Sequence, residues 1–443
     1  MTQRLPSALI VFMIGVSVAA CNAQTIPLPP TVPEPTLAST PTPPAPRKLR
    51  PTPIPTLTTA QSLIPTDSVH RLPGRLIFSV VTQPISNFPI TIETYLVERG
   101  QVPQSPLVDA GYTNLSPDGQ WLVYKRFDDR GQIHAWAAQI NCPLTPGACR
   151  LSEPLDLGLY AAEVAWSPDS IHLAYTTAGY SGKEWRSGQL FVANVISRTI
   201  TTVLDKGAGN PTFSPNGQWV LMQAGYTGYY PAVLAIAAID GRRYQSFTDS
   251  LLNWPARWRP NGDLEISMPN RPEGNGPQVL VSADGISTTQ GVYPQAPHQF
   301  LYSPDGQRLI YRAQDNIGWL HLANADGSQA RPIQSDQHWR AIAWSPDSQH
   351  LIIGHFTSKG LTKTRLVQFD QGEETTLPAE QHFIAWIDGE SYLASGPTQQ
   401  AASPDGQTWP HRTPLLRVWL DGHNELLITI AGLADQVVYW NGP

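Results

Sequence analysis

The sequence has 443 residues, of which 41 % are hydrophobic and 14 % charged, and its formal net charge at pH 7 is −6. An acidic chain is a poor match for nucleic acid or for anionic lipid, because both carry phosphate charges that require basic partners. The apolar content is ample for a core, so the fold depends on how the apolar residues are arranged along the chain.

The first twenty residues predict an export signal. Met1–Ala20 contains one basic residue, Arg4, then an apolar run and the small residues that precede Cys21. Such a run is too short for a spanning helix and is typical of a secretory signal. The segment resembles a bacterial lipoprotein signal peptide, which implies that Cys21 carries lipid. The alternative is an ordinary export signal followed by a chance cysteine.

The segment 21–73 is predicted to be a linker. From Asn22 to Pro73 it holds fourteen of the 43 prolines, many threonines and few large apolar residues. This composition cannot form a core and favours an extended, semi-rigid chain. At about 3.1 Å per residue, such a spacer lifts the following domain, 74–443, on the order of 100 Å from a membrane.

One ten-residue phrase recurs along the rest of the chain. Each copy has an aromatic or apolar residue, then Ser-Pro-Asp-Gly or a variant of it, then an apolar stretch, and successive copies are 42 to 51 residues apart. The copies begin at Leu115, Trp166, Phe213, Trp258, Tyr302, Trp344 and Trp386. A period near 45 residues indicates one supersecondary unit that is stacked many times.

Each phrase predicts a β-hairpin. Pro presets φ for a tight turn, Asp or Asn bonds to its own backbone, and Gly supplies a positive φ. Two more strands follow in most copies, several of them joined by a second turn signal such as Asp240-Gly241. Four short antiparallel strands per repeat predict an all-β fold, the β-propeller. The aromatic residue before each turn is expected to pack between blades.

The two ends of the chain are predicted to share one blade. The C-terminal segment Gln436–Pro443 has the pattern of the first half of a phrase, and GRLIFSVV, from Gly74, has the pattern of the second half. Pairing these segments closes the ring and removes exposed sheet edges. This gives eight blades, and the alternative is seven if the unit at Trp386 forms none.

The other two cysteines, Cys142 and Cys149, lie in a Pro- and Gly-containing insert. A local disulfide between them suits an exported protein. A metal site would need further ligands at shorter spacing, and the sequence offers none nearby. We therefore expect neither a metal nor a cofactor.

The tandem phrase resembles the WD-like propeller repeat of the TolB type. The resemblance rests on copies such as Ser116-Pro117-Asp118-Gly119 and Ser303-Pro304-Asp305-Gly306, and it covers about Gly74 to Trp440. It implies the fold but not the function, because such propellers occur in periplasmic binding proteins, beside peptidases and in many lipoproteins. Periplasmic TolB has six blades and a preceding α/β domain. This chain departs from both features, so the role of TolB is not carried over.

Motifs that carry catalytic chemistry are scarce. The sequence has no GxSxG elbow, HExxH, Walker or GxGxxG pattern. We therefore assign no catalytic residue.

The topology of a propeller predicts where binding residues lie. The tight Ser-Pro-Asp-Gly and Asp-Gly turns fall on one face, here called the turn face, and the longer connections fall on the opposite loop face. The residues just before each phrase should ring the mouth of the channel on the loop face: Trp339, Arg340, His298, His382, Tyr112, Tyr160, Trp254 and Asn210. Aromatics and Arg are enriched at binding hot spots, and this set contains no carboxylate for hydrolysis. The alternative for Tyr160 and Trp254 is that they only pack the channel wall.

We therefore expect an exported, lipid-anchored, monomeric propeller that binds a protein or glycan outside the membrane without catalysis. One alternative is a hydrolase or lyase that acts on envelope glycan or peptide, with its acid and base on different blades. Another is a structural component of the envelope. Two carboxylates and a His at the mouth would favour an enzyme, whereas an Arg-rich, aromatic mouth would favour binding.

Overall fold

The computed structural model describes most of the chain from residue 63 onward. It describes residues 63–65, 67–81, 92–103, 105–127, 132–143, 149–159, 161–181, 184–205, 207–224, 233–247, 256–267, 277–282, 288–292, 298–312, 319–334, 338–358, 360–370, 374–378, 381–397, 399–400, 411–431 and 433–440. These residues form β-strands and one 3-10 helix, and none of their helices has the length and apolar character needed to cross a bilayer. The predicted signal segment, residues 1–20, and the predicted lipidation site, Cys21, lie outside them.

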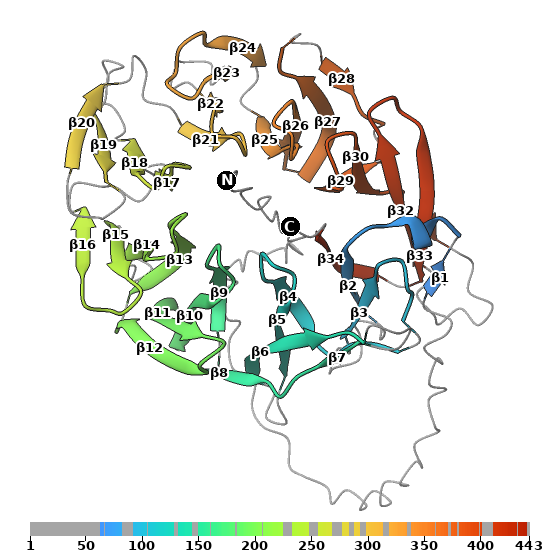
Figure 1. The fold of residues 1–443 in the computed structure, drawn as a ribbon, viewed down its shortest axis with the longest axis horizontal. Helices are drawn as coiled ribbons and strands as arrows, with labels where there is room; N and C mark the ends of the chain where they lie inside the picture. The colour runs from blue at the N-terminus through green and yellow to red at the C-terminus, as the bar shows by residue number, and fades with distance from the viewer. Residues whose placement is uncertain are drawn as a thin grey trace, which may run out of the picture.

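Eight antiparallel sheets form a ring of blades (Figure 1). Blade 1 contains β34 (Leu433–Trp440), β2 (Arg75–Val81) and β3 (Ile92–Glu98); blade 2 contains β4 (Gly111–Leu115), β5 (Trp121–Phe127), β6 (Ile133–Asn141), β7 (Arg150–Leu151) and β8 (Leu155–Leu159). Blade 3 contains β9 (Ala161–Trp166), β10 (His172–Ser181), β11 (Glu184–Asn194) and β12 (Thr199–Leu204); blade 4 contains β13 (Ala208–Phe213), β14 (Trp219–Ala224), β15 (Val233–Ala238) and β16 (Tyr244–Phe247).

The second half of the ring repeats this arrangement. Blade 5 contains β17 (Ala256–Trp258), β18 (Leu264–Ser267), β19 (Pro277–Val281) and β20 (Thr288–Val292); blade 6 contains β21 (His298–Tyr302), β22 (Arg308–Arg312), β23 (Leu320–Asn324) and β24 (Arg331–Gln334). Blade 7 contains β25 (Trp339–Trp344), β26 (His350–Thr357), β27 (Gly360–Gln368) and β28 (Glu374–Thr376); blade 8 contains β29 (His382–Trp386), β30 (Ser391–Ser395), β31 (Gln399–Gln400), β32 (His411–Trp419) and β33 (Asn424–Ala431). The eight-bladed propeller is confirmed, and the unit at Trp386 forms its own blade.

The ring closes in blade 1, as the sequence predicts. The C-terminal strand β34 is the innermost strand and pairs with β2, with Leu76 opposite Tyr439 and Ser79 opposite Gln436. Trp440 then reaches blade 2, where its indole Nε1 donates a hydrogen bond of 2.7 Å to the carbonyl of Pro117. Gly119 is required there, because a Cβ atom at this position would lie 2.4 Å from the Trp440 ring.

The repeated turn is held by its serine. In the five regular copies the buried serine hydroxyl accepts the N–H of the residue five positions later, at 2.8–3.0 Å, and donates to the Asp or Asn two positions later. The five serines are Ser116, Ser167, Ser214, Ser303 and Ser345. Each hydroxyl satisfies a backbone donor that the hairpin would otherwise leave buried without a partner.

Two copies replace the turn glycine by serine and gain a bond between blades. Ser170 and Ser348 have φ values of 61° and 64°, in the left-handed region that usually favours glycine. Their hydroxyls accept the backbone N–H of Asp118 and Asp305 in the preceding blades, at 2.9 and 3.1 Å. The turns of neighbouring blades are therefore joined to one another.

The aromatic residue before the turn packs between blades, as predicted. The indole groups of Trp258, Trp344 and Trp386 each donate a hydrogen bond to a carbonyl of the preceding blade, at 3.4, 3.1 and 3.4 Å. Buried tryptophan usually finds such a partner for its N–H. These residues hold the ring together and do not form a ligand-stacking ladder.

The propeller begins before Gly74, which corrects the predicted boundary at 73/74. The strand β1 (Leu63–Pro65) pairs with the outer strand β33 of blade 8, and the 3-10 helix η2 (Asp67–Arg71) follows it. Val69 and Leu72 are buried in the core shared by blades 1 and 8. We call β1 and η2 the clasp. The proline-rich composition concealed it, because Val69 and Leu72 are the apolar residues that this core receives from the segment among its described side chains, and two isolated apolar residues give no sequence pattern.

Candidate functional site

The structure describes the side chains of four of the eight predicted rim residues. The side chains of Trp339, Arg340, His382 and Asn210 are described. Tyr112 lies in β4 and His298 begins β21, but their side chains lie outside the described part of the structure. Tyr160 and Trp254 lie outside the described residues altogether.

Trp339 is a core residue, which corrects its assignment to the binding surface. Its side chain is only 4 % exposed and packs between blades 6 and 7, against a cluster that includes Ile310 and Leu322. The guanidinium of Arg365 lies 4.6 Å from the centre of its indole ring. Successive residues of a strand point to opposite sides. The polar residues around Trp339 in the sequence therefore do not indicate which way the indole points.

Its neighbour Arg340 is exposed on the loop face and belongs to a group of basic side chains. We call this group the basic rim; it consists of His338, Arg340, His355, Lys363 and His382. The His338 and His355 rings are 5.5 Å apart, and Lys363 is the register partner of His355. Arg340 lies over the Phe356 ring at 5.4 Å. His382 begins β29, the innermost strand of the next blade, and is exposed.

Two members of the basic rim, Arg340 and Lys363, are exposed cations. Among the described residues, no carboxylate forms an ion pair with Arg340, Lys363 or His382, whereas the nearby Arg365 pairs with Glu374 at 2.6 Å. Guanidinium, ammonium and imidazole groups each suit carboxylate, sulfate or phosphate groups. The arrangement can therefore bind an anion, and in its described residues it lacks the carboxylate of an acid/base pair.

A second polar group lies across the ring on blades 2 to 4. We call it the lysine–glutamate cluster; it consists of Lys125, Glu163, Thr176, Asn210 and Gln223. Glu163 Oε2 accepts the backbone N–H of Asn210 and the hydroxyl of Thr176, the latter at 3.4 Å. Asn210 has a φ of 50°, and its side-chain amide donates to Gln223 Oε1 at 3.0 Å.

Burial lowers the pKa of Lys125 to about 8, and the nearby negative charge of Glu163 opposes part of that shift. A lysine near this value can exchange protons at neutral pH more readily than an ordinary lysine. Glu163 adds a carboxylate beside Asn210, whereas the eight predicted rim residues include none. It lies on β9 three residues before Trp166, where the loop-based prediction did not look.

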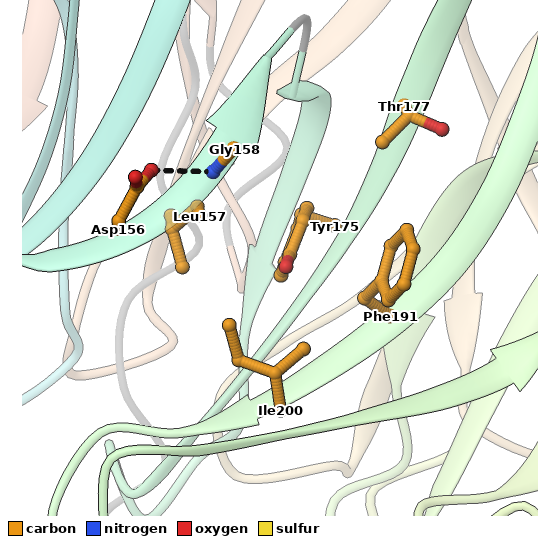
Figure 2. Close-up of a pocket in the computed structure, with 7 residues that line it drawn as sticks. All are labelled: Asp156, Leu157, Gly158, Tyr175, Thr177, Phe191 and Ile200. Carbon is orange, nitrogen blue, oxygen red and sulfur yellow. Dashed lines mark hydrogen bonds between the residues drawn. The ribbon is translucent and has the colours of Figure 1, made fainter.

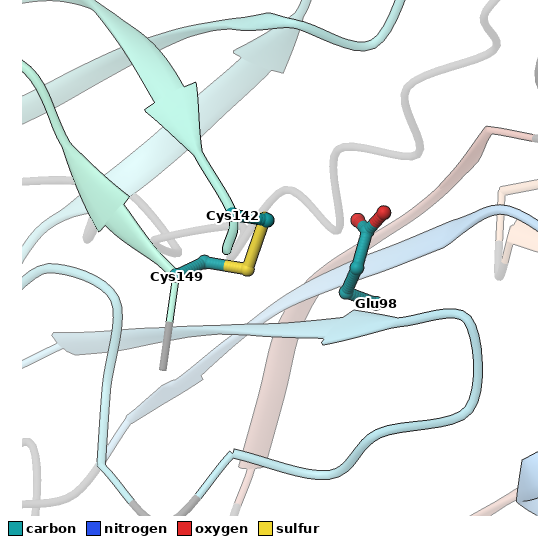
Figure 3. A group of neighbouring side chains, drawn as sticks. All are labelled: Glu98, Cys142 and Cys149. Atoms are coloured by element: carbon teal, nitrogen blue, oxygen red, sulfur yellow. A yellow bond between two sulfur atoms is a disulfide. The ribbon is translucent and has the colours of Figure 1, made fainter. Parts of the chain in front are cut away.

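The disulfide between Cys142 and Cys149 is present, with an S–S distance of 2.11 Å. The carboxylate of Glu98 lies beside the two sulfur atoms (Figure 3). Metals bind the thiolate form of cysteine, which a disulfide lacks. Glu98 also forms an ion pair with Arg75 at 2.5 Å. In this oxidised form the three side chains do not make a metal site.

Comparisons with known proteins support the fold alone. A scan against models of known families finds no match, and a search among curated proteins finds none either. Among solved structures, one described as a eukaryotic initiation factor is 10 % identical and has a TM-score of 0.51, covering 84 % of this chain and 99 % of its own.

Two further solved structures are similar to this chain. The β-propeller domain of the trilobed protease from Pyrococcus furiosus is 13 % identical, with a TM-score of 0.44, and the match covers 72 % of this chain and 96 % of that one. An oligogalacturonate lyase in complex with manganese is 12 % identical, with a TM-score of 0.42, and the match covers 82 % and 98 %.

Proposed function

We propose that this propeller is a non-catalytic recognition module that binds an anionic group of a protein or glycan through the basic rim. The observation that supports the proposal is the exposed set Arg340, Lys363 and His382, which has no carboxylate paired with it among the described residues. The chain as a whole is acidic. A local basic surface on an acidic body gives orientation and selectivity for an anion rather than general adhesion.

The module is proposed to act outside the cell membrane as a monomer. Cys21 would carry the lipid, and the proline-rich segment before the clasp would hold the ring away from the bilayer. Changing Cys21 to Ser tests this placement: the protein should move from the membrane fraction to the soluble fraction and lose incorporation of labelled fatty acid. A variant that stays in the membrane fraction would contradict lipid anchoring.

The binding proposal can be tested with the full chain and three immobilised polymers: dextran sulfate, polyglutamate and neutral dextran. We expect retention on an anionic polymer that weakens as salt rises, because exposed charges are screened. Retention on dextran sulfate alone indicates a glycan partner, and retention on polyglutamate alone indicates a protein partner. Retention on neutral dextran, or on none of the polymers, would contradict the proposal.

The matched variants are Arg340→Gln on the loop face and Arg242→Gln on the turn face, where the Arg242 side chain is 85 % exposed. Loss of a charged hydrogen bond should weaken binding about tenfold for Arg340→Gln. The control should bind as the parent does. Equal effects of the two changes would indicate adhesion without a site.

A separate observation supports a second candidate, a hydrolase or lyase that uses the lysine–glutamate cluster. Lys125, with a pKa of about 8, and Glu163 are two groups that could share proton transfer. The parent protein would then release fragments from purified envelope glycan or peptide, and Lys125→Met would not. Release that is equal for both proteins would rule out this role.

A further inference from the structure

A pocket opens between blades 2 and 3, on the other side of the ring from the basic rim (Figure 2). It has a volume of about 400 Å³ and is lined by Asp156, Leu157, Gly158, Tyr175, Thr177, Phe191 and Ile200. The first three residues come from β8, and the others from β10, β11 and β12 of the next blade. This volume lies near the lower end of the range for ligand pockets, about 300–1,000 Å³, so it suits one side chain and not a polymer.

The pocket combines aromatic rings with a carboxylate. The rings of Tyr175 and Phe191 stack with their centres 5.3 Å apart. Asp156 stands at the edge, with its side chain 62 % exposed. One of its oxygens accepts the N–H of Gly158 at 2.8 Å, which fixes the carboxylate in place.

The charge of Asp156 reaches the pocket floor. Burial raises the pKa of Tyr175 to about 12, and the negative charge of Asp156 contributes to the increase. His134 lies 3.5 Å from Asp156, and no Lys or Arg forms an ion pair with Asp156 among the residues that the structure describes. Arg198 of blade 3 links the two blades by donating to the carbonyls of Glu153 and Pro154, at 3.1 and 2.9 Å.

Exposed apolar side chains surround the same part of blade 3. Ile171, Ile196 and Ile200 are 36 %, 64 % and 41 % exposed, and they are three of the five large hydrophobic residues exposed in the described structure. The carbonyl of Ile171 bonds to the N–H of Val195, which places the first two side by side. Ile200 lies on β12, the edge strand of its sheet. A concentration of apolar groups beside a polar pocket is typical of a protein contact surface.

We propose that the outer edge of blade 3 docks a protein segment that inserts a lysine or arginine side chain into this pocket. The cationic head would lie against the Asp156 carboxylate and the aromatic rings, an arrangement that favours ammonium and guanidinium groups. Apolar residues beside the cation would cover Ile196 and Ile200. This surface is separate from the basic rim, so each can be present without the other.

The test uses the full chain and three probes: the peptide acetyl-Thr-Val-Lys-Val-Thr-amide, the same peptide with norleucine in place of lysine, and butylammonium chloride. Titration by isothermal calorimetry or NMR should show the lysine peptide binding about tenfold more tightly than the norleucine peptide. It should also bind more tightly than butylammonium, since only the peptides can cover the isoleucines.

Matched variants separate the two contributions. Asp156→Asn keeps the acceptor for the Gly158 N–H and removes only the charge, so it should abolish the preference for lysine. Ile196→Ser should weaken both peptides to a similar extent. Asp205→Asn, an exposed carboxylate just after β12, serves as the control and should change nothing.

Three results would overturn the proposal. Equal binding of the two peptides, or no binding of either, would show that the pocket does not select a cation on a polypeptide. Butylammonium binding as tightly as the lysine peptide would show a small-amine site without a docking surface. A lysine preference that survives Asp156→Asn would place the recognition elsewhere.

Discussion

The two faces of the ring are built on opposite principles. On the turn face, five buried serines make the same hydrogen bonds in five blades, and Ser170 and Ser348 join neighbouring turns. On the loop face, equivalent ends of the innermost strands carry Asn210, Trp339 or His382. Repetition on one face supplies stability that does not depend on the other. The loop face can therefore vary from blade to blade, and recognition residues are expected there.

The largest effect on stability should follow removal of β34, the strand that closes the ring by pairing with β2. Deleting Gln436–Pro443 removes most of β34, including the buried Val438 and Tyr439, and the Trp440 bond to blade 2. A loss of five or more kcal/mol should lower the melting temperature by roughly 10 °C or more. Calorimetry of the truncated protein measures this. Removing Asn441–Pro443 alone takes nothing from β34 and should leave the melting temperature unchanged.

On the loop face, Trp339 is expected to contribute to stability rather than to binding. Trp339→Ala should destabilise the protein by about 3–5 kcal/mol, because the indole fills the space between blades 6 and 7. The adjacent Arg340→Gln should change stability by less than about 0.5 kcal/mol. Denaturant unfolding of both variants checks the contrast. Similar losses for the two would place Arg340 in the core as well.

Replacing Lys125 is expected to stabilise the protein, because burying its charged ammonium group destabilises the folded state. Its folded pKa of about 8 lies below the ordinary lysine pKa of 10.5, so the unfolded chain binds more protons between these values. Stability should therefore rise as pH increases from 8 to about 10.5, with the cost fully present below pH 8. The Lys125→Met change should raise stability near pH 7 by about 1–3 kcal/mol and flatten this pH dependence. Melting curves from pH 6 to pH 10 test both statements, and a variant with the parent's pH profile would refute them.

The smallest effect should come from a single turn. Ser303→Ala removes the hydroxyl that accepts the Arg308 N–H at 3.0 Å and leaves that donor without its partner. The expected cost is about 1–2 kcal/mol. Ser197→Ala, at an exposed position on the same face, is the control and should stay within about 0.5 kcal/mol. Equal losses of stability for the two variants would mean that the backbone geometry of the repeated turn, and not its serine hydroxyl, provides the stability.

The sequence predicted those features that repetition or local chemistry determines. The turn phrase predicted the hairpins, the period predicted the blades, and the head-to-tail match predicted the pairing of β34 with β2. It could not predict the direction of Trp339, because alternation along a strand does not say which neighbouring blade a side chain meets.

The same limit applies to pairs that form only in three dimensions. Blade 5 has Arg259 where five other blades have serine, and its guanidinium reaches the fully buried Glu265 at 3.1 Å. Tyr302 of blade 6 donates to the same carboxylate at 2.9 Å. The sequence did not predict the clasp for a related reason. Val69 and Leu72 are buried only by contact with blade 8, which is distant in the sequence.

The position of the clasp has a mechanical consequence. Any tension on the chain upstream of Leu63 must enter the ring through β1, which pairs three residues with β33 of blade 8. The load then passes η2, where Arg71 pairs with Glu425 at 3.2 Å, before it reaches β2. The strand that closes the ring is thus the last to be pulled. On the proposed anchoring through the N-terminal segment, the clasp would bear the load before the β34–β2 pair that closes the ring.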